Sequence, residues 1–377
     1  MGPQSKREYL EQILRRYQRA DRKYKTQILN EFCATCNYHR KHALRLLNQS
    51  GAGHSRRPGP APYYTDGIRT ILKHFWLITN RLCSKLLKAA IPLWLPYYPD
   101  QRALTPEIRE QLKHISPATI DRLLRPVRKQ YGSHGLPGTR PRQSLKLQIP
   151  IRTSHGDVLT PGFFQADSVA HGGDSVEGDF VWSITMTDVF SQWTESRAVW
   201  NKGYSNIAQA IADMETHLPF SILGFHVDNG GEFLNHHLWH YFRDRQPPVQ
   251  FTRTRPDHKD DNAYVEQKNW IHVRQLLGYQ RIADPNLLPI IKRLYEAWDL
   301  WRNLFCPTLK LLSKEKIGSR YVRHYGPPRT PAQRLIDSPA LNEAVKNHLT
   351  EKLTNVNPVN LKKFIDHHQH LVLSALR

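Results

Sequence analysis

The chain has 377 residues, and 39% of them are hydrophobic, including nine tryptophans, which excludes a wholly disordered protein. Its formal net charge of +21 indicates a polyanionic partner, nucleic acid before a membrane surface. The charge is uneven, because residues 1–150 carry +19, residues 151–281 carry −5 and residues 282–377 carry +7. We therefore expect an acidic core between basic segments that hold the polyanion.

Residues 1–50 predict a helical DNA-binding domain. Apolar positions recur at helical spacing over 9–17 and 28–32, and a break at Cys36-Asn37 precedes a basic helix over 38–48. Short helices, a tight break and a basic second helix outline a helix-turn-helix. Its DNA contacts would be Arg40, Lys41 and Arg45. A helical hairpin with a solvated basic face would give the same pattern.

The same segment holds a cysteine–histidine pattern. Cys33, Cys36, His39 and His42 fall within ten residues, whereas zinc ligand pairs usually have a longer insert between them. Along one helix these side chains would turn around the axis and could not converge on one ion, so we expect no zinc. Four cysteines in the whole chain also predict no disulfide framework and are typical of a reducing cytosol.

Residues 51–64 predict a linker rich in Gly and Pro, and residues 65–131 predict a second helical domain. Thr105-Pro106 and Ser116-Pro117 each combine an N-cap residue with proline at the first helical position. We expect Pro126 to end or kink the second of these helices early. We interpret the block as a second helix-turn-helix with DNA contacts at Arg122, Arg125 and Arg128. Structural helical bundles are the alternative.

Neither end of the chain predicts a membrane segment. The most apolar stretch, Phe75 to Leu95, is interrupted by three basic residues and by Pro92, which favours a buried helix over a bilayer span. The first 25 residues hold no uninterrupted apolar run of the kind found in signal peptides. We therefore expect no membrane partner.

Residues 132–160 predict another linker, and residues 161–281 predict a mixed α/β domain. Expected strands cover 163–169, 180–187, 193–200, 221–227 and 249–253, and expected helices cover 207–217, 234–243 and 263–277. Three successive strands followed by alternating helices and strands are typical of a mixed sheet. Residues 282–377 predict a mostly helical C-terminal region, interrupted at 325–334.

Three acids in the α/β domain suggest chemistry. Asp167 lies inside the first expected strand, Asp228 ends the fourth, and Glu266 lies near the start of the last helix. Buried carboxylates cost free energy unless something compensates, and a divalent cation is one such compensation. Carboxylates without Cys or His suit Mg²⁺ or Mn²⁺, and two such ions can promote displacement at phosphorus. The alternative is acids that cap helices or pair with arginines.

Three stretches carry a resemblance to a known family. They are FQAD at 164–167, VDNGGEF at 227–233 and NAYVEQKN at 262–269. Together they resemble the catalytic core of Asp-Asp-Glu transposases and retroviral-type integrases, although the gap between Asp228 and Glu266 is slightly longer than in the integrases. Residues 320–335, with PPRTPAQRL, also resemble the C-terminal part of bacterial insertion-sequence transposases. Asp188, another acid of the sheet, falls outside the family's metal triad.

The resemblance implies an RNase H-like core over 161–281, preceded by the helix-turn-helix domains. It implies Asp167, Asp228 and Glu266 as catalytic ligands of two Mg²⁺ or Mn²⁺ ions, which cleave DNA at the element's ends and join it to a target. Residues that would position the scissile phosphate or strand are Asn229, Asn262, Lys268 and Asn269. Residues that would line the DNA channel are Arg253, Arg255 and Lys259.

The expected partners are double-stranded DNA, as terminal repeats and as target, and further copies of the chain in a dimer or larger assembly on DNA. The expected location is the bacterial cytoplasm, at the nucleoid. Two other readings stay open. A catalytically inactive DNA-binding regulator would not need the intact acidic set. A structure-specific nuclease of the same fold, such as a junction resolvase, would not need two helix-turn-helix units.

Overall fold

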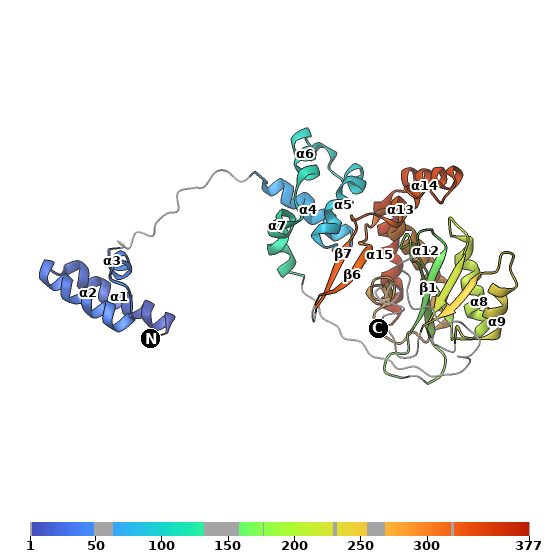
Figure 1. Ribbon diagram of the computed structural model, residues 1–377, viewed down its shortest axis with the longest axis horizontal. Coiled ribbons are helices and arrows are strands. Elements are labelled where there is room, and N and C mark those ends of the chain that lie inside the picture. Colours follow the sequence, from blue (N-terminus) through green and yellow to red (C-terminus); the bar gives the residue numbers. More distant parts are fainter. Residues whose placement is uncertain are drawn as a thin grey trace. The chain divides into compact units, whose positions relative to one another are not determined.

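The computed structural model describes residues 2–48, 63–131, 158–175, 177–228, 232–254, 268–317 and 320–376 (Figure 1). The chain forms two compact units, Met1–Tyr63 and Tyr64–Arg377.

The N-terminal unit is a bundle of α1 (Pro3–Arg19), α2 (Arg22–Cys36) and α3 (Arg40–Leu47). Asp21 caps α2 by accepting a hydrogen bond from the backbone N–H of Tyr24. The helix ends at Cys36 because Asn37 adopts a left-handed backbone with φ of 52°. The predicted helices and the break between them are therefore present. A small apolar core ties them together, made of Ile13, Tyr17, Ile28, Leu29, Phe32, Cys36, Ala43 and Leu47.

The second unit begins with four helices, α4 (Asp66–Ile78), α5 (Ser84–Trp94), α6 (Pro106–His114) and α7 (Pro117–Lys129). Thr105 and Ser116 cap α6 and α7 through their side chains, as their positions before proline predicted. Pro126 does not end α7 early, since the helix runs on to Lys129, and a kink at Pro126, the other expected effect, stays a prediction. Pro126 lies in the last turn, where a missing N–H weakens only the end of the helix.

A five-stranded sheet follows, with β1 (Phe163–Ala170), β2 (Val181–Asp188), β3 (Thr194–Trp200), β4 (Gly224–Val227) and β5 (Gln250–Arg253). The strand order is β3-β2-β1-β4-β5. The first three strands are antiparallel, whereas β4 pairs parallel with β1 and β5 pairs parallel with β4. All five predicted strands are present, so this part of the chain is a mixed α/β fold with a mixed sheet.

The helices α8 (Tyr204–Thr216) and α9 (His236–Arg243) cover one side of this sheet. Ile211 and Phe242 share an apolar cluster with Phe164, Met186 and Phe225 from the strands. Side chains alternate between the two faces of a strand, so residues next to these in sequence point to the opposite face. That opposite face is more polar, with Thr185 and Thr187 buried on it.

The long helix α12 (Leu288–Phe305) covers the outer strand β3. Asp299 accepts a hydrogen bond from the Ser196 backbone N–H at 2.6 Å, and Asn303 both accepts from and donates to the Thr194 backbone, at 3.0 and 2.9 Å. An outer strand has backbone groups without a strand partner on one side, and these side chains satisfy some of them.

The segments 65–131, 161–281 and 282–377, expected as separate domains, share one hydrophobic core. Trp94 of α5 lies edge-on to Trp301 of α12 at 5.9 Å between ring centroids, and its indole N–H donates to the Phe305 carbonyl at 3.0 Å. The same buried cluster joins Phe75, Trp94, Trp298 and Trp301. Residues from all three segments therefore meet in this cluster, and the expected domain boundaries within 65–377 stay predictions.

The rest of the chain is mostly helical, as predicted. The helices are α13 (Pro331–Ile336), α14 (Glu343–Asn355) and α15 (Pro358–Ala375), and a short helical stretch comprises η4 (Trp270–Arg274) and α11 (Gln275–Leu277). The sequence did not predict the two-stranded ribbon of β6 (Leu311–Ile317) and β7 (Arg320–Tyr325). None of the described helices combines the length and apolar character that crossing a bilayer requires.

Candidate active site

The sheet places two of the predicted acids side by side. In the parallel pairing of β1 with β4, Ala166 is the partner of Val227. Asp167 and Asp228 follow these two residues directly, so they lie at the same level on neighbouring strands. Ala166 packs into the apolar cluster, and the strand alternation turns Asp167 to the polar face. Both acids are only partly buried, which leaves the pair accessible to a ligand.

Asn269 contacts the first acid from the helical stretch that follows the sheet. Its side-chain N–H donates to Asp167 Oδ2 at 2.5 Å, and the Ser168 backbone N–H donates to Asp167 Oδ1 at 2.8 Å. The two carboxylate oxygens of Asp167 thus accept from two different donors, the side chain of the distant Asn269 and the backbone of the next residue, Ser168. Within the described ranges, Asn269 Oδ1 is buried and has no hydrogen-bond partner.

Glu232 is a site residue that the sequence reasoning did not single out. It accepts a hydrogen bond from the Ser168 hydroxyl at 2.8 Å, so the segment after Asp228 is tied to the residue after Asp167. Asn235 donates to the Glu232 carbonyl at 2.8 Å and caps α9. The signal was present, because Glu232 belongs to the DNGGEF stretch.

Lys268 is buried, with 6% of its surface exposed, whereas a solvated lysine was the ordinary expectation for this position. Burial, together with the charges of Arg302 and Arg334, lowers the pKa of Lys268 to about 7. Arg302 itself is buried and lies against the rings of Trp298 and Trp301. Lys268, the residue next to Asn269, is therefore buried near two arginines, and these surroundings disfavour the charged form of its amine.

The stretch that carries Lys268 and Asn269 is attached to α12. His272 Nδ1 lies 3.2 Å from Asp299 Oδ1, and both side chains are buried. Burial raises the pKa of Asp299 well above its usual value and lowers that of His272. Residues Trp270–Arg274 form a π-helical turn, a feature that is frequent at functional sites.

Several predicted site residues lie outside the described residues, namely Asn229, Arg255, Lys259, Asn262 and Glu266. The third acid of the proposed triad is among them. Within the part of the chain that the structure describes, no group of three or more His, Cys, Asp or Glu side chains is arranged to hold a metal ion.

The predicted DNA-contacting arginines differ in their surroundings. Arg45 and Lys41 of α3 and Arg122 and Arg125 of α7 are exposed. Arg40 of α3 is exposed too and donates to Asn30. Arg128 pairs with Asp121 at 2.5 Å and donates to the Ser84 hydroxyl at 2.9 Å, which gives it a structural contact between α5 and α7.

Arg253 is 7% exposed at the end of β5, and burial lowers its pKa. The side chain of Arg253 is therefore not in the exposed position that lining a DNA channel favours, and the expected role stays a prediction. A strand-end arginine looks the same in sequence whether its side chain turns inward or outward.

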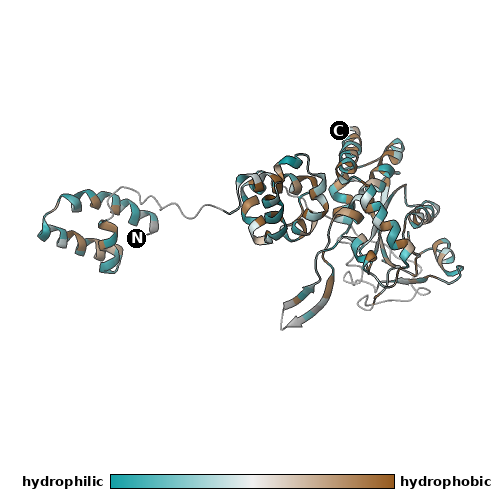
Figure 2. Cartoon of the chain, turned by 90° about the horizontal axis from the view of Figure 1, so that it is seen from above, coloured by the Kyte–Doolittle hydropathy of each residue, from teal (hydrophilic) through white to brown (hydrophobic). Residues whose placement is uncertain are grey.

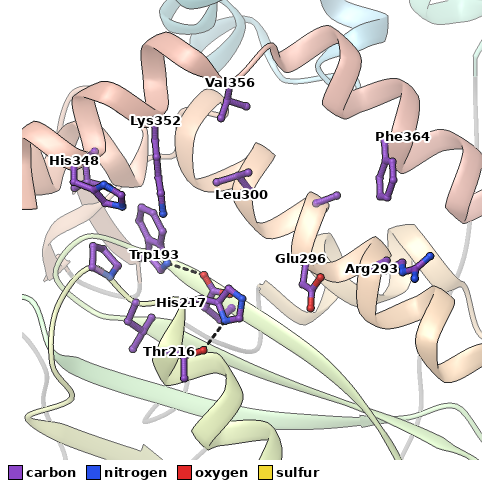
Figure 3. A pocket seen from close by; sticks show the side chains of 15 residues that line it. Trp193, Thr216, His217, Arg293, Glu296, Leu300, His348, Lys352, Val356 and Phe364 are labelled. Atoms are coloured by element: carbon purple, nitrogen blue, oxygen red, sulfur yellow. Dashed lines mark hydrogen bonds between the residues drawn. The ribbon is translucent and has the colours of Figure 1, made fainter.

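A cavity of about 500 Å³ lies elsewhere in the second unit (Figure 3). Its lining comes from β3, the end of α8, α12, α14 and α15, and includes Trp193, Leu300, Val356 and Phe364. Trp193 donates to Glu195 at 2.9 Å at its inner side. None of the predicted site residues lines this cavity, so it is separate from the paired acids.

No family model matches the chain. Among solved structures, the catalytic core domain of BIV integrase is 16% identical and covers 31% of this chain and 70% of its own, with a TM-score of 0.25. A chain of the simian T-cell lymphotropic virus intasome in complex with PP2A regulatory subunit B56 gamma is 15% identical, with 50% and 60% coverage and a TM-score of 0.26.

One known protein is much more similar to this chain in sequence. The uncharacterized protein y4rM of Sinorhizobium fredii (strain NBRC 101917 / NGR234) is 36% identical over 333 residues. The match covers 87% of this chain and 94% of that protein, so it includes both the helical and the α/β segments. The chain therefore belongs to the same protein family as y4rM of Sinorhizobium fredii.

Proposed function

We propose that the chain is a polynucleotidyl transferase of the Asp-Asp-Glu type, the transposase of a bacterial insertion sequence, with an RNase H-like core. The observation that carries the proposal is the register of β1 and β4, which sets Asp167 and Asp228 level on neighbouring strands. The motifs at 164–167, 227–233 and 262–269 support the same reading.

The donors present suit hard cations. Asp167 and Asp228 offer carboxylate oxygens, and Glu266 would add a third carboxylate, so the set fits Mg²⁺ or Mn²⁺ better than zinc. Two such ions, when bound, activate a nucleophilic oxygen and stabilise the leaving oxygen at phosphorus. Asn269 Oδ1 is buried and has no hydrogen-bond partner among the described residues, so it would offer a further hard oxygen donor beside Asp167.

The chain's own residues prepare this site before any ligand binds. Asn269 and the Ser168 backbone hold the Asp167 carboxylate in one orientation. The Ser168–Glu232 hydrogen bond holds the segment after Asp228 close to β1. The His272–Asp299 contact anchors the described stretch that begins with Lys268, which follows Glu266 by two positions in the sequence. Such outer contacts orient metal ligands and are costly to remove.

The basic helices supply DNA recognition in this proposal. The exposed Lys41 and Arg45 of α3, and Arg122 and Arg125 of α7, would contact phosphates and base edges at the element's ends. Strand transfer at two ends needs two active sites, so the active form would be a dimer or larger assembly on DNA.

The test uses the full chain and a labelled duplex that carries the terminal repeats flanking its gene. The duplex is incubated with Mg²⁺, with Mn²⁺ or with neither, and a scrambled duplex serves as the control. The proposal predicts metal-dependent nicking at the repeat ends and joining of those ends to a second DNA. Binding without cleavage in either metal would indicate a regulator, and cleavage without preference for the repeats would indicate a nuclease.

A further inference from the structure

The ribbon β6–β7 extends from the second unit as two strands with little around them (Figure 2). Its base is well fixed. The Gly326 N–H donates to the Lys310 carbonyl at 2.9 Å, and Thr308 and Arg329 exchange backbone hydrogen bonds at 2.8 and 3.3 Å. Arg334 of α13 donates to the Thr308 carbonyl and hydroxyl, at 2.6 and 2.7 Å. The ribbon is therefore a rigidly rooted arm.

Several described side chains of the arm face solvent, whereas Leu311, Ser313 and Val322 are partly buried. Leu312 is 67% exposed and Tyr325 is 50% exposed, and Arg323 and His324 are also exposed. A two-stranded ribbon is only marginally stable in water without a third strand or a packed face. Its pairing thus depends on its base, and its exposed surface is left for contact with another molecule.

The arm concentrates positive charge. Residues 310–329 hold one acid, Glu315, and six basic residues, which are Lys310, Lys314, Lys316, Arg320, Arg323 and Arg329. This stretch accounts for +5 of the net +7 of residues 282–377. Residues 282–309, by contrast, are neutral overall. The excess charge of the C-terminal region therefore lies mainly in the ribbon and its base.

We propose that the ribbon β6–β7 is a DNA-binding arm that lies in a groove of duplex DNA, where its net positive charge is attracted to the phosphates and the exposed Arg323 contacts one of them. The major groove is wide enough to admit a two-stranded ribbon, and a ribbon's backbone brings side chains from both strands within reach of the phosphates. The arm adds a contact that neither helix-turn-helix segment supplies, and the inference rests on the proposed function.

The close approach of Lys310 to Gly326 makes the test clean. Residues 311–325 are replaced by two glycines, which join chain ends that are already hydrogen-bonded in the structure. A second variant, Arg323→Ala with His324→Ala, keeps the ribbon and removes two exposed groups. The matched control removes two exposed basic side chains elsewhere, Arg293→Ala with Lys363→Ala. Circular dichroism and thermal unfolding check that each variant is folded.

Binding of each protein to a fluorescent duplex is measured without metal over a range of KCl concentrations. Each lost phosphate contact lowers the slope of log K against log salt by about 0.9. We expect the ribbon deletion to reduce the slope by about 2–4 and the double substitution by about 1, with the control variant changing affinity by less than about threefold. The cleavage chemistry plays no part in this readout.

The outcomes separate the two claims. If the wild-type protein binds the duplex and the folded deletion variant shows the same salt slope, the DNA-binding role of the arm is overturned and the proposed function stands. Wild-type protein that fails to bind duplex DNA overturns both. If the ribbon deletion abolished binding to anionic lipid vesicles and left DNA binding unchanged, the proposed DNA-binding role of the arm would also be overturned. The ribbon would then be assigned to a lipid surface.

Discussion

Asn269 donates a hydrogen bond from its side-chain nitrogen to Asp167 Oδ2 at 2.5 Å, across 102 residues of sequence. This contact joins the helical stretch after the sheet to the central strand β1. It also brings the end of the NAYVEQKN motif to the FQAD motif, which the resemblance alone did not place in space. Asn269 and Asp167, one residue from each motif, are therefore in direct contact.

The first prediction concerns this contact. Asn269→Ala frees the Asp167 carboxylate to rotate, so metal-dependent cleavage should need more Mg²⁺ and slow by about 10–100-fold. Titrating cleavage with Mg²⁺ distinguishes a weakened ion affinity from a lost catalytic group. Asn347→Ala, at an exposed position of α14, serves as the matched control. An unchanged Mg²⁺ dependence would show that Asn269 does not orient Asp167 for metal binding.

The second prediction concerns Lys268. Its folded-state pKa of about 7 lies below the ordinary lysine value of 10.5, so the folded state disfavours the charged form. Burying the charged amine costs stability. This cost is absent above pH 10.5, grows as the pH falls, and is complete below about pH 7. Lys268→Met should therefore stabilise the fold, by an amount of the order of a few kcal/mol near pH 7.

Denaturant unfolding of Lys268→Met and wild type at pH 7, 8.5 and 10 measures this effect. The stability difference should shrink steadily with rising pH. Lys363→Met, on the exposed side of α15, should show no such trend. A difference that is constant with pH would mean that Lys268 titrates normally in the folded protein.

The third prediction separates two arginines of α7. Arg125 is exposed, whereas Arg128 pairs with Asp121 and Ser84. Arg125→Ala should lower the slope of log K against log salt for DNA by about 1 and leave the unfolding temperature unchanged. Arg128→Ala should lower stability by about 0.5–2 kcal/mol, because it removes hydrogen bonds between α5 and α7. If Arg128→Ala changes only DNA binding, its contact with Asp121 is incidental to the fold.

Much of the α/β domain followed from sequence because its signals are local. Alternating residues such as those around Ile184 and Met186 identify a strand wherever it pairs. Thr105 and Ser116 correctly predicted where α6 and α7 begin, because a capping hydroxyl and the following proline act within one turn. The sequence suggested that Asp167 and Asp228 would converge. It did not predict that they would lie at the same level on neighbouring strands, because the register of a sheet depends on which strands pair.

Other features depend on contacts that no local pattern records. The packing of Trp94 on Trp301 merges segments that linkers appeared to separate, and it is set by shape complementarity between distant helices. The ribbon β6–β7 escaped notice because its charged, irregular sequence lacks the apolar alternation of a half-buried strand. Buried charges were also missed, since Lys268 and Arg253 have the residue types of solvated positions.

Asp188, which the resemblance left outside the metal triad, has surroundings unlike those of Asp167. It is fully buried and accepts hydrogen bonds from the backbone N–H groups of Gly162 and Ser191, at 2.9 and 2.6 Å. Burial raises its pKa to about 6. This acid holds a turn together, whereas Asp167, on the neighbouring strand, faces a partly open surface.

The central claim is that Asp167 and Asp228 act together in metal-dependent DNA cleavage. The most direct test measures single-turnover cleavage of the terminal-repeat duplex by Asp228→Asn at saturating protein, with bound DNA quantified in the same samples. Asp174→Asn, an exposed acid before β2, is the control. The account predicts that Asp228→Asn binds the duplex as wild type does and cleaves it at least about 10²–10³-fold more slowly. Cleavage within a few-fold of wild type would remove Asp228 from the active site and contradict the account.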